Sequence, residues 1–342
     1  MACIMKIVID GFGGDNSPDE VIKGCVWAVE EFNPQIIITG DEKILKSRFS
    51  ALGLSYKNIT IENADGVIQV EDNPLDIRSS KAGTSMGVGF SLVKSGEAQA
   101  FVSAGSTAAL MTGGSVVIGR IKGIKRPALA PIMPGVPPEA SPASPGSSFH
   151  YLLLDGGANL ECRPDMLVQF AIMGSIYAEK TMGVTNPRIG LLNIGTEEEK
   201  GRALELETHA LLKNAPINFI GNVEARDVPL GVCDVVVTDG FTGNIYLKAV
   251  EGMGAFMKRS LKDLFTKNGA TKVGYLLAKG GVKDISRKAD YREIGGSPLL
   301  GTAKPVIKAH GSSDAKAFKN AIKQAVKFVE SNAIEEIQKA IK

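Results

Sequence analysis

The sequence predicts an α/β protein in which a mostly parallel sheet carries helices on both faces. Short runs rich in Val, Ile and Leu alternate with longer segments of helical period, and this alternation is typical of such a sheet. Several runs are apolar at consecutive positions, as strands covered on both faces must be. The 342 residues are 44% hydrophobic and 22% charged, which is enough for a sizeable core. We expect residues 1–342 to form one α/β unit.

The expected strands are short apolar runs that end in turn residues, and they cover residues 6–10, 36–39, 59–62, 100–103, 151–155, 189–193, 217–221, 234–239 and 305–310. Helices fit between them, for example at residues 164–182, 199–213 and 312–340. Residues 131–150 are rich in Pro, Ser and Gly, so we expect a surface loop there.

Composition excludes several classes of protein. The formal net charge of +2 provides no dominating positive field, so no nucleic-acid partner is expected. No stretch reaches the roughly 18 uninterrupted apolar residues of a spanning helix, and the first residues lack a basic leader, which favours the cytoplasm. The GFGGD stretch at residues 11–15 lacks GxGxxG spacing, which argues against a dinucleotide site.

The most informative pattern is the glycine and small polar residues that follow many of the expected strands. In open α/β sheets ligands bind beyond the carboxyl ends of the strands, and glycine lets backbone N–H groups approach an anion. Any single instance is better explained by a tight turn, but seven together favour a shared site. The candidate binding residues are Gly13, Gly14, Asp15, Ser103, Gly105, Ser106, Thr107, Asn159, Asn193, Gly195, Asn222, Asp239, Thr242, Gly243, His310 and Ser312.

Several of these turns also open expected helices. Ser106, Thr107, Thr242 and Ser312 stand where a helix would start. Each could be a plain N-cap. If the helix starts point into one crevice, they would instead form a cradle for phosphate.

Long stretches of the chain resemble the bacterial phosphate acyltransferase (PlsX) family. The resemblance covers about residues 5–325 and rests on the strings IDGFGGD, VSAGSTAALM, GIKRPALAP, LLDGGAN, GLLNIGTEEEKG, INFIGNVEARD, DVVVTDGFTGN, GGSPLLG and IKAHGSSDAKAF. This resemblance implies a fold similar to phosphotransacetylase and isopropylmalate dehydrogenase. It also implies transfer of a fatty acyl group from acyl carrier protein to inorganic phosphate, for phospholipid synthesis, by a homodimer peripherally bound to the membrane.

The resemblance carries catalytic roles onto Lys200 and Asn244. The chain departs from the usual family pattern at Ser106, which replaces an amide, at Ala108, which replaces a glycine, and at Gly156. The Pro/Ser-rich segment also looks longer than usual. Ser106 still offers a donor and an acceptor.

The implied reaction needs no nucleophile from the enzyme, because the phosphate dianion attacks the thioester itself. It needs the two substrates held together and a donor for the oxyanion, which Lys200 could supply. Without the resemblance, Lys200 would be interpreted as a solvated surface lysine. His310 could act as a general acid, although a structural role is favoured. We expect no metal and no cofactor, with Asp10, Asp155 and Asp239 ordering the turns.

Residues 253–292 combine an apolar stripe with a strong positive charge. Between residues 258 and 292 there are ten Lys and Arg against three Asp. A core or dimer-interface helix is one interpretation, and a helix pair that touches anionic lipid or docks an acidic carrier protein is the other. The candidate membrane contacts are Phe256, Met257, Leu261, Leu264 and Phe265. The functional alternatives are a short-chain phosphotransacetylase that uses coenzyme A and a non-catalytic membrane scaffold.

Overall fold

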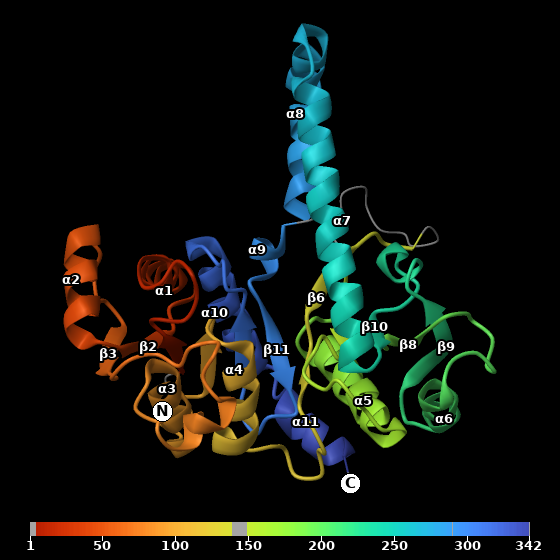
Figure 1. The fold of residues 1–342 in the computed structure, drawn as a ribbon, viewed down its shortest axis with the longest axis horizontal. Helices are drawn as coiled ribbons and strands as arrows, with labels where there is room; N and C mark the ends of the chain where they lie inside the picture. The colour runs from red at the N-terminus through yellow and green to blue at the C-terminus, as the bar shows by residue number, and fades with distance from the viewer. Residues whose placement is uncertain (1–4, 139–148, 289, 342) are drawn as a thin grey trace.

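Two sheets, rather than one, form the centre of the protein in a computed structural model that describes residues 5–138, 149–288 and 290–341 (Figure 1). The first sheet has the strand order β3-β2-β1-β4-β12-β11-β5, and the second has the order β6-β7-β10-β8-β9. Most neighbouring strands are parallel; the antiparallel pairs are β11–β12, β11–β5 and β6–β7. The predicted class, a mostly parallel α/β fold, is confirmed.

The strands of the first sheet are β1 (Lys6–Asp10), β2 (Gln35–Gly40), β3 (Ile59–Asn63), β4 (Ala100–Ser103), β5 (Ala128–Leu129), β11 (Gly296–Leu300) and β12 (Val306–Ala309). Those of the second are β6 (Ile132–Gly135), β7 (Phe149–Leu154), β8 (Arg188–Asn193), β9 (Asn218–Glu224) and β10 (Val235–Val237). All nine expected strands are present. The three that the sequence did not reveal are β5, β6 and β11, which are two residues long or interrupted by Pro.

The α-helices are α1 (Asp19–Phe32), α2 (Glu42–Leu52), α3 (Ser85–Ser95), α4 (Thr107–Gly113), α5 (Pro164–Lys180), α6 (Ala203–Leu212), α7 (Gly240–Thr266), α8 (Gly269–Lys288), α9 (Tyr291–Ile294), α10 (Ala315–Glu330) and α11 (Ala333–Ala340). Short 3-10 turns cover Pro74–Arg78 and Val228–Leu230, and a π-turn, Gly114–Ile118, continues α4. Among the described residues, no helix combines the length and the hydropathy that a transmembrane span requires.

Three sequence expectations need correction. The helix expected over residues 312–340 is two helices, because Asn332 adopts a left-handed backbone (φ 52°) between α10 and α11. The helix expected at residue 199 begins at Ala203, so the three glutamates lie in a loop. The expected loop at residues 131–150 holds strand β6 and the start of β7, while residues 139–148 lie outside the described part.

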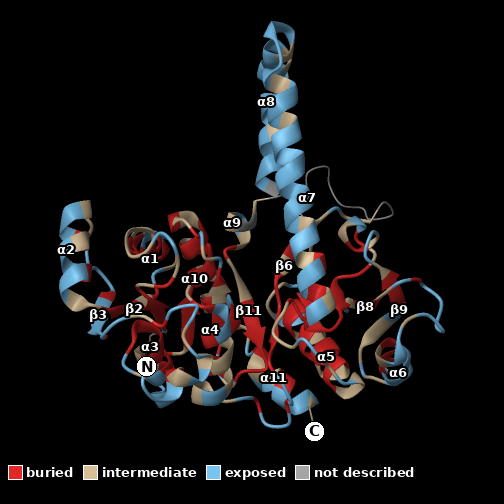
Figure 2. Ribbon diagram, viewed as in Figure 1, coloured by how far each residue is buried: buried red, intermediate tan, exposed pale blue. Residues whose placement is uncertain are grey.

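One hydrophobic cluster joins the two sheets. It includes Ile7 and Ile9 of β1 together with Leu152 of β7 and Val235 of β10, all fully buried. Figure 2 shows the buried residues concentrated in the two sheets and the helices against them, whereas the α7–α8 hairpin is exposed along its length. The hairpin therefore projects from a body whose two halves share a core.

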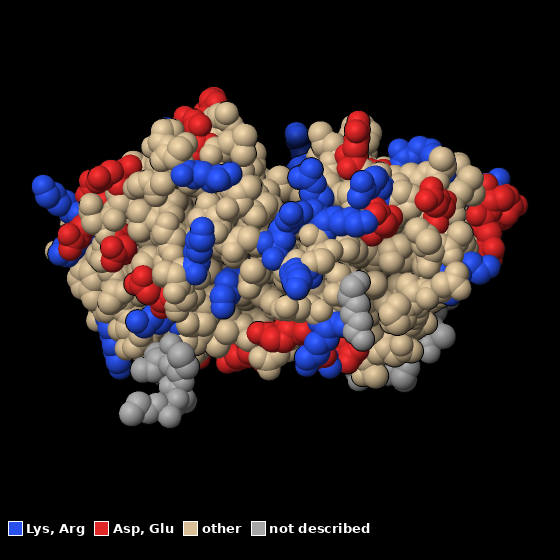
Figure 3. Space-filling view, turned by 90° about the horizontal axis from the view of Figure 1, so that it is seen from below, with Lys and Arg blue, Asp and Glu red and all other residues tan. Residues whose placement is uncertain are grey.

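The face opposite the hairpin carries both signs of charge. Figure 3 shows many of its Lys and Arg side chains gathered across the middle, with Asp and Glu on both sides of them. This face offers local basic clusters rather than a continuous positive field.

Helix α1 packs against α10 through a glycine, and we predict that a methyl group there is costly. A Cβ atom on Gly24 would lie 2.5 Å from the Phe318 Cβ and 2.9 Å from the Ala315 carbonyl oxygen. Gly24→Ala should lower the free energy of unfolding by about 1–3 kcal/mol, measured by urea titration. The matched control is Gly281→Ala in α8. No atom beyond its chain neighbours and its own helix backbone lies within 4 Å of a Cβ added there. The free energy of unfolding should therefore rise by up to about 1 kcal/mol, because Ala favours a helix more than Gly does. Equal effects of the two substitutions would contradict the packing argument.

Candidate functional site

The predicted binding residues lie at strand ends of both sheets. On the first sheet, Gly13, Gly14 and Asp15 follow β1, Ser103–Thr107 close β4 and open α4, and His310 and Ser312 follow β12. On the second sheet, Asn159 follows β7, Asn193, Gly195 and Lys200 follow β8, and Asp239–Asn244 follow β10. Asn222 is the exception, since it lies inside β9 opposite Leu191.

Asp10 organises the strand ends of the first sheet. Its carboxylate accepts a hydrogen bond of 2.7 Å from the Ser103 hydroxyl and one of 3.2 Å from the Phe12 N–H. The Ser103 hydroxyl in turn accepts from the Gly105 N–H at 3.0 Å. Burial raises the pKa of Asp10, and the hydrogen bonds from neighbouring hydroxyl and N–H groups oppose that rise. The two turns are thereby fixed against each other, as expected for an aspartate that orders glycine turns.

The turns after β1 and β12 are also joined. The Asp15 N–H donates to the Gly311 carbonyl at 2.8 Å, and the Asn16 amide donates to the carbonyls of Ser312 and Ser313 at 3.2 and 3.3 Å. The three turns of the first sheet therefore form one connected rim.

Three predicted residues of this rim are engaged within it. Ser106 caps α4, its hydroxyl accepting from the Ala109 N–H at 3.4 Å. The His310 Nδ1 lies 2.8 Å from the Ser312 hydroxyl oxygen. Helix α10 starts after Asp314, not at Ser312, because the Asp314 side chain accepts from the Ala317 N–H at 3.0 Å.

Asp155 plays the corresponding part on the second sheet. One carboxylate oxygen accepts from the N–H groups of Leu129, Gly157 and Ala158, at 3.0, 3.1 and 2.9 Å. The other accepts from the backbone and side-chain N–H groups of Asn159, at 2.7 and 2.8 Å. Asn159 is therefore held in the turn, and its carbonyl accepts from the Gly240 N–H at 2.8 Å.

Helix α7 starts directly against this turn. Asp239 caps it by accepting from the Thr242 N–H at 2.7 Å. A Cβ atom on Gly243 would lie 1.9 Å from the Asp155 carbonyl oxygen, so only glycine fits. The Asn244 side chain lies one position further on, facing Gly157, whose own Cβ position is 3.3 Å from the Asn244 amide oxygen.

The loop that carries Lys200 is anchored at both ends. The Asn193 side chain accepts from the Ile194 N–H at 2.8 Å and donates to the Lys200 carbonyl at 3.0 Å. The Asn222 amide reaches from β9 to the Glu197 carbonyl at 2.7 Å, and its oxygen lies 3.0 Å from the His209 Nδ1. Asn193 and Asn222 thus shape the loop with their side-chain amides.

Arg202 ties the same loop to the start of α7. Its guanidinium lies 2.6 Å from the Asp239 carboxylate and also pairs with Glu205 of α6. Both carboxylates raise the pKa of Arg202, so the guanidinium remains charged.

The Lys200 side chain is exposed, and no ion pair within the described ranges involves it. Of the glutamates beside it, Glu198 is engaged elsewhere, since its carboxylate lies 2.9 Å from the Lys213 ammonium. The geometry therefore supplies an exposed cation on an anchored loop at the strand ends.

Lys308 of β12 is a site residue that the sequence analysis missed. Its ammonium donates to the carbonyls of Ala104 and Ala309, at 3.4 and 2.5 Å. Burial lowers the pKa of Lys308 to about 8, the acids Asp10 and Asp15 oppose that shift, and Lys248 of α7 adds to it. A lysine inside the apolar string PVIKAH was the signal available in the sequence.

Helix α7 connects the strand-end turns of the second sheet with the rim of the first sheet. It starts beside the Asp155 turn of the second sheet, yet its Glu251 and Lys248 act electrostatically on His310 of the first sheet. The pKa of His310 is lowered, mainly by burial. Residues at the strand ends of both sheets therefore lie within electrostatic reach of α7, and we call the region between them the crevice.

Comparison with known proteins agrees with this architecture. A family model described as "Fatty acid synthesis protein" matches residues 5–336. The phosphate acyltransferase of Caldanaerobacter subterraneus subsp. tengcongensis is 47% identical over 341 residues, covering 98% of this chain and 97% of the relative. The phosphate acyltransferases of Alkaliphilus oremlandii and Clostridium novyi are each 46% identical, covering 98% of this chain and 97% and 98% of the relatives.

The chain belongs to the phosphate acyltransferase family. Membership identifies it as an acyltransferase. Among solved structures, a phosphotransacetylase from Streptococcus pyogenes superposes with a TM-score of 0.62 at 20% identity, covering 96% of this chain and 94% of that one. A branched-chain phosphotransacylase from Enterococcus faecalis gives 0.57 at 15% identity, covering 96% and 99%. These two likenesses show the shared fold.

Lys308, which is partly buried, should make the free energy of unfolding depend on pH in a defined window. Its pKa in the folded protein is about 8, below the ordinary value of 10.5, so between these values the unfolded chain binds more protons. The contribution of Lys308 to the free energy of unfolding is therefore fully present above pH 10.5, and it is lost as the pH falls towards 8. The free energy of unfolding of the native protein minus that of Lys308→Met should rise from pH 8 to pH 10.5. Parallel urea-unfolding curves across that range would contradict the burial of this ammonium.

Proposed function

We propose that the crevice transfers a long-chain fatty acyl group from acyl carrier protein to inorganic phosphate. The product is an acyl phosphate, which would serve phospholipid synthesis. The observation that carries the proposal is Lys200, an exposed ammonium on a loop anchored by Asn193, Asn222 and Arg202. The names of the relatives, at 46–47% identity over nearly the whole chain, support a transfer that involves phosphate.

The proposed step needs only the two substrates and fixed donors. A phosphate oxygen attacks the thioester carbon, the new C–O bond forms, the C–S bond breaks, and the thiolate leaves and takes a proton. Lys200 holds the phosphate, and the Asn244 amide donates to the oxyanion that develops on the acyl carbon. Both groups stand at strand ends of the second sheet, and no cofactor enters the step.

His310 fits a positioning role better than that of an acid. Burial lowers its pKa, so the neutral imidazole predominates near neutral pH. Its Nδ1 already lies 2.8 Å from the Ser312 hydroxyl oxygen. A pantetheine thiolate leaves readily, so the step does not depend on a strong proton donor.

The second candidate is a short-chain phosphotransacetylase that uses coenzyme A. The likeness of the fold to the phosphotransacetylase of Streptococcus pyogenes favours it. The two candidates are separated by comparing acyl carrier protein and coenzyme A thioesters as donors. A non-catalytic scaffold has no use for the connected polar rims on both sheets.

Removing the ammonium should leave a folded but slow enzyme. Lys200→Ala should lower turnover roughly 10²–10³-fold, the loss typical of one donor to an oxyanion. The assay follows free thiol and acyl phosphate from long-chain acyl carrier protein and phosphate. The control is Lys213→Ala, which removes a nearby lysine that pairs with Glu198. Near-normal turnover in a folded Lys200→Ala protein would exclude Lys200 from the step.

We further propose that the α7–α8 hairpin places the enzyme on an anionic membrane surface as a cytoplasmic, peripheral homodimer. Phe256, Met257 and Leu264 of α7 are 62%, 52% and 53% exposed, and Leu277 of α8 is 86% exposed. Lys and Arg side chains accompany them along both helices, and such a surface suits anionic lipid or an acidic carrier protein.

Leu261 and Phe265 were also predicted membrane contacts, but their side chains are less exposed than those of Phe256, Met257 and Leu264. Both are partly covered, and the Phe265 ring centroid lies 5.3 Å from that of Tyr275 in α8. Phe265 supports the contact between the two helices, and Leu261 is less exposed than the stripe residues, so both are poor positions for testing a membrane contact.

The double substitution Met257→Glu and Leu264→Glu should abolish sedimentation with anionic vesicles, because it places two negative charges on the exposed stripe. Ile44→Glu in α2, at a position 45% exposed, is the matched control and should sediment normally. Light scattering should show the same oligomer for all three proteins. If the double variant becomes monomeric, the stripe serves subunit pairing and the membrane proposal fails.

A further inference from the structure

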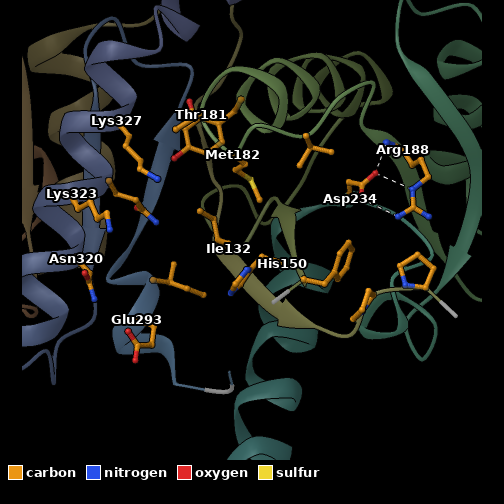
Figure 4. Close-up of a pocket in the computed structure, with 17 residues that line it drawn as sticks. Ile132, His150, Thr181, Met182, Arg188, Asp234, Glu293, Asn320, Lys323 and Lys327 are labelled. Atoms are coloured by element: carbon orange, nitrogen blue, oxygen red, sulfur yellow. Dashed lines mark hydrogen bonds and ion pairs between the residues drawn. The ribbon is translucent and has the colours of Figure 1, made fainter. Parts of the chain in front are cut away.

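A cavity lies at the amino ends of strands in the five-stranded sheet, away from the candidate catalytic residues. It has a volume of about 620 Å³ and lies between α10, the last turn of α5 and the five-stranded sheet (Figure 4). Its lining includes Phe149 and His150, which begin β7, and Arg188, which begins β8. The candidate catalytic residues follow the opposite, carboxyl ends of the same sheet. The volume is in the range of ligand-binding pockets.

The charges on the cavity wall do not cancel. Arg188 and Asp234 form a two-pronged ion pair with both distances at 3.0 Å, and Glu293 lies 2.6 Å from the Lys316 ammonium. His150 is neutral near pH 7 because burial lowers its pKa. The remaining charges are two lysines.

Those two lysines both come from α10. The Lys323 ammonium lies 5.2 Å from the centre of the Phe32 ring. Figure 4 shows Lys327 reaching from α10 towards the cavity, and no ion pair within the described residues neutralises it. The α10 wall is therefore positively charged.

Two buried polar groups in the lining lack a hydrogen-bond partner among residues 5–138, 149–288 and 290–341. They are the Tyr177 hydroxyl and the Gln324 amide oxygen, on side chains that are fully buried and 8% exposed. A buried polar group without a partner costs free energy. Neither atom is exposed to the cavity in the present conformation, so a bound polar ligand would recover that free energy once a small side-chain rotation brings the group to the cavity wall. The Gln324 amide, turned by 180°, can present an N–H donor instead of its oxygen. The Tyr177 hydroxyl can donate as well.

Most of the remaining lining is apolar. Ile132, Phe149, Met182 and Val184 cover the cavity on the side of the sheet and the end of α5, and Ile294 adds to it from α9. The polar members Thr181 and Asn320 already bond to Ser331 and to the Arg292 carbonyl. A ligand that satisfies every wall must be amphipathic, with an anionic head near α10 and a hydrocarbon tail.

We propose that this cavity binds a fatty acyl anion, its carboxylate or phosphate head held by Lys327, Tyr177 and Gln324 and its chain lying on the apolar wall. This is a binding site separate from the crevice, and it does not depend on the proposed reaction. A free fatty acid and an acyl phosphate share the chemistry that the cavity recognises.

The test is calorimetric titration of the full chain with four probes: dodecanoate, dodecyl phosphate, dodecanol and inorganic phosphate. One or both amphipathic anions should bind, and their relative affinities identify the head group, whereas dodecanol and inorganic phosphate should bind at least ten times more weakly. Lys327→Gln should weaken binding of the anion roughly 10-fold or more. Lys57→Gln, which removes an exposed lysine in the loop before β3, should not.

Gln324→Leu gives a two-sided check. It should weaken binding of the anion, yet raise the melting temperature, because it removes a buried amide oxygen that has no partner within the described part of the chain. A structural role alone would lower the melting temperature. Unchanged binding in both Lys327→Gln and Gln324→Leu would overturn the proposal, and so would a cavity that holds ordered water only.

Because the crevice is proposed to hold an acyl chain as well, the site of binding must be mapped. A fatty acid with a diazirine at the end of its chain should, after irradiation, label peptides that contain Met182, Val184 or Ile294. Labelling confined to the strand ends near Asn244 would also overturn the proposal. Lys200→Ala should retain the labelling, so loss of turnover and loss of this site are distinguishable.

Discussion

The structure depends above all on the buried carboxylate of Asp155. It accepts five hydrogen bonds, and they come from both sides of the junction between the two sheets. Leu129 belongs to β5 at the edge of the seven-stranded sheet, whereas residues 157–159 form the turn after β7 of the other sheet. The acid is fully buried, so its burial raises its pKa while these donors favour the charged form. One side chain thereby fixes the edge of one sheet to the turn against which α7 starts.

From that junction the geometry of the crevice follows. Gly240 bonds to Asn159, Gly243 packs on the backbone of Asp155, and Asn244 is then directed towards Gly157. The loop with Lys200 is placed by a second set of bonds, of which Arg202 to Asp239 is the link to α7. Asp10 and Ser103 do the same for the opposite rim. Side chains that bind nothing but the backbone or one another therefore set the positions of Lys200 and Asn244.

The sequence revealed the class of fold and placed most candidate residues at strand ends, because apolar runs and the glycines after them are local signals. It could not reveal β5 or β11, since a two-residue strand and a strand containing Pro298 carry no clear pattern and are defined by their neighbours. The break at Asn332 was hidden for a similar reason: nothing in the helical pattern of residues 312–340 marks a left-handed residue. Lys308 and Arg202 were missed because their roles depend on contacts with distant acids. The cavity lined by Tyr177 and Gln324 is formed by elements far apart in the chain, so no local sequence motif predicts it.

Helix α7 is continuous from the crevice to the far end of the hairpin, as Figure 1 shows. Asn244 and Thr266 are 22 residues apart on one helix, which at 1.5 Å per residue is a span of about 33 Å. The helix acts as a rigid spacer that sets the height of the crevice above any surface touched by the hairpin tip. A fatty chain embedded in such a surface cannot reach Asn244 directly. Under the proposed function, the acyl donor would therefore be delivered by a soluble carrier, and the acyl phosphate would have to cross the same distance to reach that surface.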